Sequence, residues 1–314
     1  MKSKHFIFLF SCILLVTSLF SVTSNAVGAT GSDTLIVDKQ VKVLKGKKLS
    51  SGYKQPTNVV AAKITGKRVS EVVASYNKFN TNTFTYNTII NVHQYDSNKK
   101  KWKVIKSLKY NNEDSSFEYI TKGKLLDNSK EQVVLGMYSG SGAYLSPIII
   151  GSNDGKTVKK ILQPTGEYFN GGAVIKGKQL YLLSNTIVVK KYVYKNKKFY
   201  SYKGTGADDR KVAAGAKHLL TLQNVGGHTM IDGYTYNKNG ERTIKMKVGE
   251  KLSIVRNFTK DSEVYGYRLL FDSGNDILSY GTVFKAKKPG KIVWHIEPEA
   301  YNDYSQTVTI TIVK

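Results

Sequence analysis

The longest regular patterns in this chain alternate apolar and polar residues with the period of a β-strand. Thr88 to Lys106 reads TIINVHQYDSNKKKWKVIK, and Thr186 to Lys203 reads TIVVKKYVYKNKKFYSYK with one residue fewer. Each copy has a strand, a polar turn at Asn-Lys, and a returning strand that starts near an aromatic residue. The two copies predict a β-hairpin that recurs as a structural unit.

A second repeat lies around these hairpins. Ile64 to Tyr76 aligns with Leu125 to Met137, and Val174 to Asn185 is a weaker third copy. Each copy has a polar turn followed by a strand that is apolar enough to be buried, centred on Val-Val in the first two. Self-similarity of this length is typical of stacked or radially arranged β-units.

Short β-branched runs predict strands from the start of the folded chain. Leu35 to Val37 and Val41 to Leu44 are two such runs, and Lys45-Gly46 ends the second. Turns containing glycine or asparagine recur beyond them, and the pattern shows no capped amphipathic helix of useful length. The fold class is therefore predicted to be all-β.

The C-terminal part shows the clearest alternation. Apolar residues recur at every second position, with polar residues between them, as a half-buried antiparallel sandwich requires. Their positions are Phe284, Ala286, Ile292, Trp294, Ile296, Val308, Ile310 and Ile312. Small and charged residues at 206–215 mark a linker before this part. We therefore expect a β-repeat domain at 35–205 and a sandwich domain at 216–314.

The chain begins with a segment that has the features of a secretory signal peptide. Lys2 and Lys4 precede an apolar run from Phe6 to Val22, and small residues follow, with cleavage expected after Ala26 or Ala29. Residues 1–26 are therefore expected to be removed, and 27–34 to form a flexible leader. The mature protein is predicted to be secreted and extracellular, with the cell wall as one place where it could be held, since no later run is long enough to span a bilayer.

Removal of the signal peptide changes the chemistry that remains. The only cysteine, Cys12, leaves with it, so the mature chain has no disulfide, thiolate or cysteine-bound zinc. This absence suits a Gram-positive exporter. Two lysines and no acid also leave, which lowers the formal charge from +25 to +23. Such a protein is expected to bind anionic polymers in a salt-dependent way, although lysines also protect sheet edges and aid solubility.

Residues of about 55–205 resemble the FG-GAP or VCBS-like repeats of β-propeller proteins. The resemblance rests on the turns, on the strands around Val-Val, on the Gly-Ser-rich stretch from Gly136 to Leu145, and on the hairpin that follows. It implies a propeller-like or open β-repeat domain, because three copies are too few for an ordinary closed propeller. Many members bind calcium, but the turn at 66–68 has no acid and the turn at 127–129 has one. We assign no cofactor and no metal ligand.

Residues of about 244–314 are similar to bacterial Ig-like domains. The matching segments are VGEKL at Val248 to Leu252 and FKAKKPG at Phe284 to Gly290. Gly266 to Leu269 loosely resembles a segment of chagasin-type protease inhibitors. The loops at 257–260 and 297–299 lack the inhibitory motifs of that family, so a protease-inhibitor-like antagonist is only an alternative.

No set of residues predicts a catalytic centre. Ser139 and Ser141 lie in Tyr-Ser-Gly-Ser-Gly, which is not the Gly-x-Ser-x-Gly motif of a nucleophile elbow. His93, His218, His228 and His295 have no metal-ligand spacing, and we expect His93 and His295 on sheet surfaces. A hydrolase acting on wall or polysaccharide would need two carboxylates across a cleft, and it stays open as an alternative. No catalytic residue is assigned, and whether the protein is an enzyme stays undecided.

The strongest functional signal is the interleaving of lysines and aromatic residues in the two hairpins. Such a surface could bind anionic glycans or polyphosphate through charge and stacking. The candidate contacts are Lys99, Lys100, Lys101, Trp102, Lys190, Lys191, Tyr192, Tyr194, Lys197 and Lys198. The alternative is a solvated sheet face. Nucleic acid is disfavoured as a partner because no recognition module is apparent. The leading hypothesis is a non-enzymatic binding protein of the cell envelope.

Overall fold

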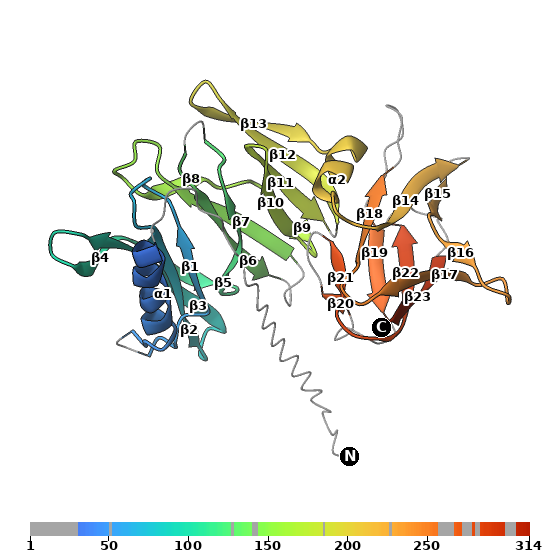
Figure 1. The fold of residues 1–314 in the computed structure, drawn as a ribbon, viewed down its shortest axis with the longest axis horizontal. Coiled ribbons are helices and arrows are strands. Elements are labelled where there is room, and N and C mark those ends of the chain that lie inside the picture. Colours follow the sequence, from blue (N-terminus) through green and yellow to red (C-terminus); the bar gives the residue numbers. More distant parts are fainter. Residues whose placement is uncertain are drawn as a thin grey trace, which may run out of the picture.

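Strands account for most of the chain in the computed structural model, so the predicted all-β fold class is confirmed (Figure 1). The structure describes residues 31–49, 52–126, 129–139, 144–184, 186–225, 228–256, 267–271, 278–279, 283–298 and 306–314. The expected signal peptide and residues 27–30 of the expected leader lie outside these ranges. Within the described ranges, no helix is both long and apolar enough to cross a membrane.

The N-terminal strands form three antiparallel sheets, each with four strands joined in chain order. Sheet A holds β1 (Asn58–Ala62), β2 (Glu71–Asn80), β3 (Thr85–Asp96) and β4 (Lys101–Glu113). Sheet B holds β5 (Phe117–Gly123), β6 (Gln132–Ser139), β7 (Tyr144–Gly151) and β8 (Lys159–Leu162), with the short β9 (Tyr168–Phe169) beside β7. Sheet C holds β10 (Gly172–Lys176), β11 (Gln179–Ser184), β12 (Ile187–Lys195) and β13 (Lys198–Lys203). The two predicted hairpins are confirmed as β3–β4 and β12–β13.

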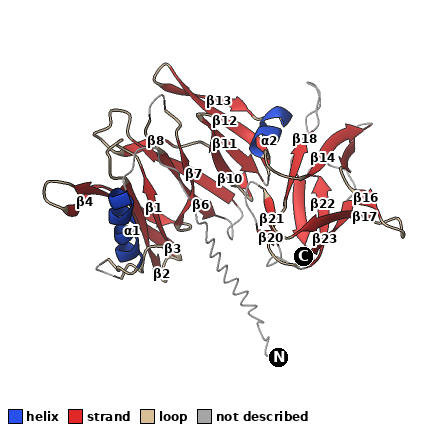
Figure 2. Ribbon diagram, viewed as in Figure 1, coloured by secondary structure: helices blue, strands red, loops and turns tan. Residues whose placement is uncertain are grey.

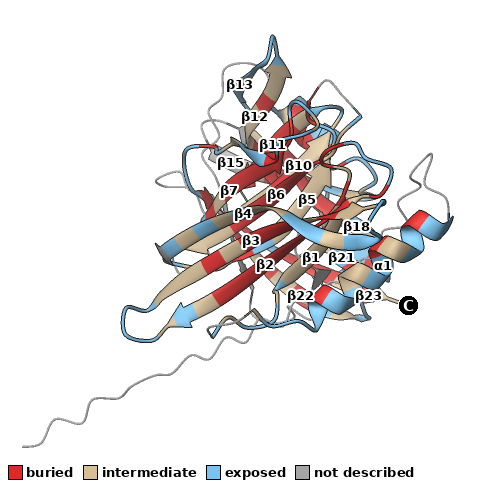
Figure 3. Ribbon diagram, turned by 90° about the vertical axis from the view of Figure 1, so that its left-hand side faces the viewer, coloured by how far each residue is buried: buried red, intermediate tan, exposed pale blue. Residues whose placement is uncertain are grey.

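Side-chain alternation explains how the three sheets stack. On β6, Val133 and Leu135 pack against sheet A, whereas Val134 packs toward sheet C. β7 repeats the pattern, with Ile148 on one face and Ile149 on the other. The middle sheet is thus buried on both faces, which is why its strands read as continuous apolar runs. In Figure 3 the central strands are largely buried, whereas the hairpin ends are exposed.

The sheets come together at their first strands and separate toward their fourth strands. β5 lies beside both β1 and β10. The approach to β10 is tight, because a Cβ atom on Gly123 would lie 2.8 Å from Cγ2 of Ile175. β4 and β13 lie far apart on the outside of the molecule (Figure 1). We call this arrangement the three-sheet stack, and its sheets do not close into a ring.

A helix covers each outer face of the three-sheet stack (Figure 2). On sheet A, Val37 and Leu44 of α1 (Gly31–Lys45) pack in one cluster with Val72, Ala74 and Tyr76. On sheet C, Val212 of α2 (Gly206–Val212) packs in a cluster with Tyr181, Leu183 and Val188. The apolar outer faces of the two terminal sheets are thereby buried. α1 begins inside the segment expected to be a flexible leader, and α2 occupies much of the segment expected to be a linker.

The strands predicted at 35–37 and 41–44 are wrong, because both runs belong to α1. Val37, Val41 and Leu44 stand at positions i, i+4 and i+7, which places them on one side of a helix. Their β-branched composition favours strands only weakly, and packing against sheet A overrides that preference. The helical spacing was therefore present in the sequence but masked by residue type.

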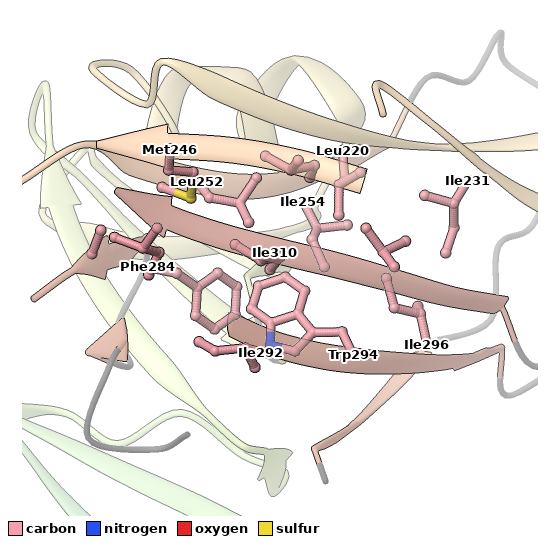
Figure 4. Packing of buried hydrophobic residues seen from close by; sticks show 14 of the residues in the cluster. Leu220, Ile231, Met246, Leu252, Ile254, Phe284, Ile292, Trp294, Ile296 and Ile310 are labelled. Carbon is pink, nitrogen blue, oxygen red and sulfur yellow. The ribbon is translucent and has the colours of Figure 1, made fainter. Parts of the chain in front are cut away.

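The C-terminal strands form two five-stranded sheets. Sheet D has the order β15 (His228–Asp232), β14 (His218–Val225), β18 (Lys251–Arg256), β21 (Phe284–Ala286) and β20 (Leu278–Ser279). Sheet E has the order β16 (Thr235–Tyr236), β17 (Arg242–Lys247), β23 (Gln306–Val313), β22 (Gly290–Pro298) and β19 (Tyr267–Phe271). The two sheets enclose one core, in which the rings of Phe284 and Trp294 lie 4.7 Å apart (Figure 4). All eight alternating residues predicted to face inward are buried, which confirms the pattern.

Strand pairing in these two sheets is not purely antiparallel. β14 pairs with β18 in parallel, and β17 pairs with β23 in parallel. The expectation of an antiparallel sandwich was therefore incomplete. Hydrophobic alternation specifies which face of a strand is buried, but it does not specify the direction of its neighbour.

A buried ion pair joins the three-sheet stack to the C-terminal sheets. Arg256 on β18 donates from Nε and Nη2 to the two carboxylate oxygens of Asp209 on α2, at 2.7 and 2.9 Å. Nη2 also donates to the carbonyl of Val188 on β12, at 2.6 Å. Nearby, Thr186 Oγ1 donates to the carbonyl of Ile254, and Ile187 packs into the C-terminal core. The two parts therefore share both a polar network and a hydrophobic core.

Candidate polyanion-binding surface

Lysine-rich turns connect the third strand to the fourth strand in each sheet of the three-sheet stack. We call them tip A (96–101), tip B (151–160) and tip C (195–198). Tip A contains SNKKK, tip B contains SNDGKTVKK, and tip C contains KNKK. Because each tip follows the third strand of a meander, the same topological position recurs three times with the same kind of charge.

In tip A an acid inside the turn holds the backbone. Oδ1 of Asp96 accepts from the backbone N–H groups of Asn98 and Lys99, both at 3.2 Å. These bonds, chiefly the one from Lys99, and the nearby ammonium of Lys103 lower the pKa of Asp96. Lys99, Lys100 and Lys101 are exposed around it.

Tip B is built in the same way. Oδ1 of Asp154 accepts from the backbone N–H groups of Lys156 and Thr157 at 2.8 and 2.7 Å, and from Ser152 Oγ at 2.9 Å. These bonds hold the pKa of Asp154 well below its ordinary value. Lys156, Lys159 and Lys160 are exposed. Sequence reasoning missed this tip because no aromatic residue marks it, although the Ser-Asn-x-x-Lys pattern was available.

Tip C is a two-residue turn between β12 and β13. Asn196 and Lys197 have φ values of 51° and 59°, the left-handed conformation that tight hairpins require at both turn positions. Lys195 and Lys198 stand directly opposite each other across the hairpin. All three lysines of tip C are exposed.

The structure places the ten sequence-predicted contacts in three different environments. Five of them are exposed at tips A and C: Lys99, Lys100, Lys101, Lys197 and Lys198. Trp102 and Tyr194 are half-buried beside those tips, each against another ring. The ring centroids are 5.5 Å apart for Trp102 and Tyr95, and 4.9 Å apart for Tyr194 and Phe199.

The remaining three predicted contacts lie farther along β12. Lys191 faces α2 and donates to both carboxylate oxygens of Asp208, at 2.9 and 3.0 Å. Tyr192 is buried between sheets B and C. The ammonium of Lys190 lies 5.7 Å from the centroid of the Tyr192 ring. Strand alternation turns Lys191 and Tyr192 to opposite faces, both covered, so the structure does not bring these two side chains to the tip surface.

Two acids in the three-sheet stack, the buried Glu71 and the half-buried Glu131, support the backbone. Oε2 of Glu71 accepts from the N–H groups of Ile64 and Thr65 at 2.9 and 3.1 Å, and Oε1 accepts from Gln94 Nε2 at 2.9 Å. Glu131 accepts from the N–H of Lys63 at 2.8 Å and donates its own N–H to the Lys63 carbonyl, at 2.8 Å. Both carboxylates therefore fix loop geometry, and Glu131 links sheet B to sheet A.

The other residues considered for catalysis have local partners or covered positions. His218 lies 2.7 Å from Glu250, and Ser139 donates to Glu167 at 3.3 Å. His93 was expected on a sheet surface, but its Nε2 is buried without a hydrogen-bond partner among the described residues. Burial, and to a smaller extent the charge of Lys47, lowers the pKa of His93 to about 4. His295 lies 3.1 Å from Thr307 Oγ1.

Several sequence candidates fall outside the described residues. They are Ser141, the loop at 257–260 that was compared with an inhibitory loop, and Glu299 in the second loop of that comparison. Among the residues that the structure describes, no group of three or more His, Cys, Asp or Glu side chains is arranged to hold a metal ion.

No protein-family model and no curated protein matches this chain. Its function is therefore inferred from the residues and the geometry described above.

Proposed function

We propose that this protein is a secreted, basic, non-enzymatic binding protein of the cell envelope, and that it contacts anionic wall polymers or glycans. The observation that carries the proposal is the recurrence of exposed lysines at tips A, B and C. Long-range attraction between such lysines and a polyanion needs no deep cleft, and it accounts for the large positive charge.

We further propose that the three-sheet stack is a degenerate arc of FG-GAP or VCBS-like propeller blades, and that the C-terminal sheets are an Ig-like domain. Three four-stranded meanders with adjacent first strands support the first assignment. Two facing sheets around a single core that includes Trp294 support the second. In this proposal, the C-terminal domain is a spacer or a second binding surface.

The test is sedimentation of the mature protein with purified Gram-positive cell walls. We expect binding at low salt and release at high salt, because ions screen exposed charges. Walls stripped of teichoic acid should bind much less protein. Absence of binding at low salt, or binding that high salt leaves unchanged, would contradict the proposal.

A further inference from the structure

We propose that tips A, B and C form one multivalent site for a long, flexible polyanion with repeated phosphate groups. This inference rests on the proposed function and specifies its ligand class and its mode of binding. Each of the three tips presents three lysines. In each sheet these lysines lie at the connection between the third and the fourth strand. They lie on the diverging side of the three-sheet stack, where β4 and β13 are well separated (Figure 1).

Because the sheets diverge, a ligand that contacts all three tips has to be long. A small anion can occupy one tip, but it cannot reach from tip A to tip C. A polymer with regularly spaced charges can bind one tip and remain tethered near the next. Binding to the second tip is then effectively intramolecular, so the affinity of the whole polymer rises without any new type of contact. The geometry therefore favours a polymer over a compact anion.

The side-chain chemistry of the tips favours a flexible polyanion that is held without fixed bidentate contacts. Every cation in the three tips is a lysine, and the arginines lie elsewhere in the sequence. An arginine fork suits fixed bidentate recognition, whereas a lysine ammonium acts as a compact point charge on a flexible stem. Lysines therefore suit a flexible phosphodiester or phosphoanhydride chain that has no single bound conformation. Among the described residues, Lys99, Lys100, Lys197 and Lys198 have no carboxylate partner in an ion pair.

Two lysines occupy positions that do not favour lysine. Lys100 and Lys197 have φ values of 49° and 59°, a region that glycine or asparagine adopts at lower cost. Lys195 and Lys198 also place like charges directly opposite each other, which destabilises a hairpin. Lys178 has the same positive φ in the β10–β11 turn, outside the tips, so the like-charge pair is the feature that distinguishes tip C. A bound polyanion would relieve the repulsion in this pair, which supports a binding role.

The first experiment measures affinity for linear inorganic polyphosphate of graded length, from tripolyphosphate to long chains. We expect affinity per chain to rise with length and to level off once a chain spans the tips. Three variants each replace one tip: Lys99, Lys100 and Lys101→Gln; Lys156, Lys159 and Lys160→Gln; Lys195, Lys197 and Lys198→Gln. Each should weaken binding of long polyphosphate about tenfold, and the combined variant by more than about a hundredfold.

The matched control removes three charges from the C-terminal sheets, by replacing the exposed Lys245, Lys287 and Lys291 with Gln. We expect its binding of long polyphosphate to be close to that of the unmodified protein. If the tip variants bind like this control, the multivalent site is refuted while polyanion binding itself survives. Tripolyphosphate binding as tightly as long chains would also refute it. No polyphosphate or wall binding at all would instead refute the proposed function.

A single substitution separates binding from folding. Lys197→Gly removes one charge and places glycine where φ is positive, so the thermal unfolding midpoint should not fall. Affinity for long polyphosphate should nevertheless decrease, and the slope of log affinity against log salt should become shallower by roughly one. An unchanged affinity and slope would show that this lysine does not contact the polymer.

Discussion

At the scale of single residues, His93 shows how a residue expected on a sheet surface becomes half-buried. It lies opposite Val72 on the face of sheet A that α1 covers. Its Nε2 atom is buried without a partner among the described residues, and the pKa of the ring is lowered to about 4 by burial and by Lys47. Protonation in the folded state is thus disfavoured, because the charged ring would have to remain desolvated.

The half-buried His93 ring predicts a specific pH dependence of stability. The unfolded chain binds a proton near pH 6.5 and the folded protein only near pH 4, so the contribution of His93 is lost as the pH falls between these values. Replacing His93 with Gln should remove this contribution. Urea unfolding of both proteins from pH 7 to pH 4 should show the free energy of unfolding falling more steeply for the unmodified protein. Parallel curves would contradict the assignment.

At the scale of elements, one bracing device recurs in neighbouring sheets. Glu71 starts β2 and accepts from the backbone N–H groups of Ile64 and Thr65. Gln132 starts β6, and its Oε1 accepts from the N–H groups of Leu125 and Leu126 at 2.6 and 3.2 Å. Both side chains are fully buried, and they stand at equivalent positions of the sequence repeat. In both copies of the repeat, the side chain at this position accepts from two backbone N–H groups, although it is a glutamate in one copy and a neutral glutamine in the other.

This equivalence predicts the effect of exchanging the two residue types. Gln132→Glu should destabilise strongly, because it buries a new charge and directs an oxygen at the Lys130 carbonyl that now accepts from Nε2. Glu71→Gln keeps one oxygen for the two backbone N–H groups, but its new NH2 group faces that of Gln94. Rotating the Gln94 amide would lose the bond that its Oε1 accepts from Lys67, so some cost remains. We expect a cost of about 1–3 kcal/mol for Glu71→Gln and a larger cost for Gln132→Glu, measured by denaturant unfolding. Equal losses in the free energy of unfolding for the two variants would contradict this account of Glu71 and Gln132.

The sequence predicted those elements whose pattern lies within one short segment, and it missed those that depend on contacts with distant segments. The hairpins at β3–β4 and β12–β13 and the alternation around Trp294 were readable because strand period and turn chemistry are local. α1 was missed because β-branched residues obscured the spacing of Val37, Val41 and Leu44. The covered positions of Lys191 and Tyr192 were also missed, since alternation does not say which faces another layer covers.

At the scale of the whole molecule, the Arg256–Asp209 pair makes the three-sheet stack and the C-terminal sheets depend on each other. The carboxylate of Asp209 also accepts from the backbone N–H groups of Val188 and Arg256, at 2.8 and 3.0 Å. Gly206 adds a close contact, because a Cβ atom there would lie 2.5 Å from the Arg256 carbonyl oxygen. The junction is thus both hydrogen-bonded and in close backbone contact.

Removing one partner of this pair should reveal the coupling. Asp209→Ala leaves the guanidinium of Arg256 buried without its counter-ion, which costs about 3–5 kcal/mol. We expect the unmodified protein to unfold in one transition and Asp209→Ala in two. Calorimetry would follow both parts, and tryptophan fluorescence in a Trp102→Phe background would follow Trp294 in the C-terminal core. The double variant Asp209→Leu with Arg256→Met removes both charges and should recover part of the stability. A single transition with unchanged midpoint in Asp209→Ala would refute the coupling.

The two helices on the three-sheet stack also constrain how such a chain could change its length by duplication. α1 already covers the free face of sheet A, and α2 covers that of sheet C. A fourth sheet added at either end would have to displace a helix and its buried contacts before it gained any of its own. A fourth sheet inserted between two existing ones would meet apolar faces on both sides. We therefore expect duplication to add sheets within the segment between α1 and α2, with these two helices still covering the outer sheets.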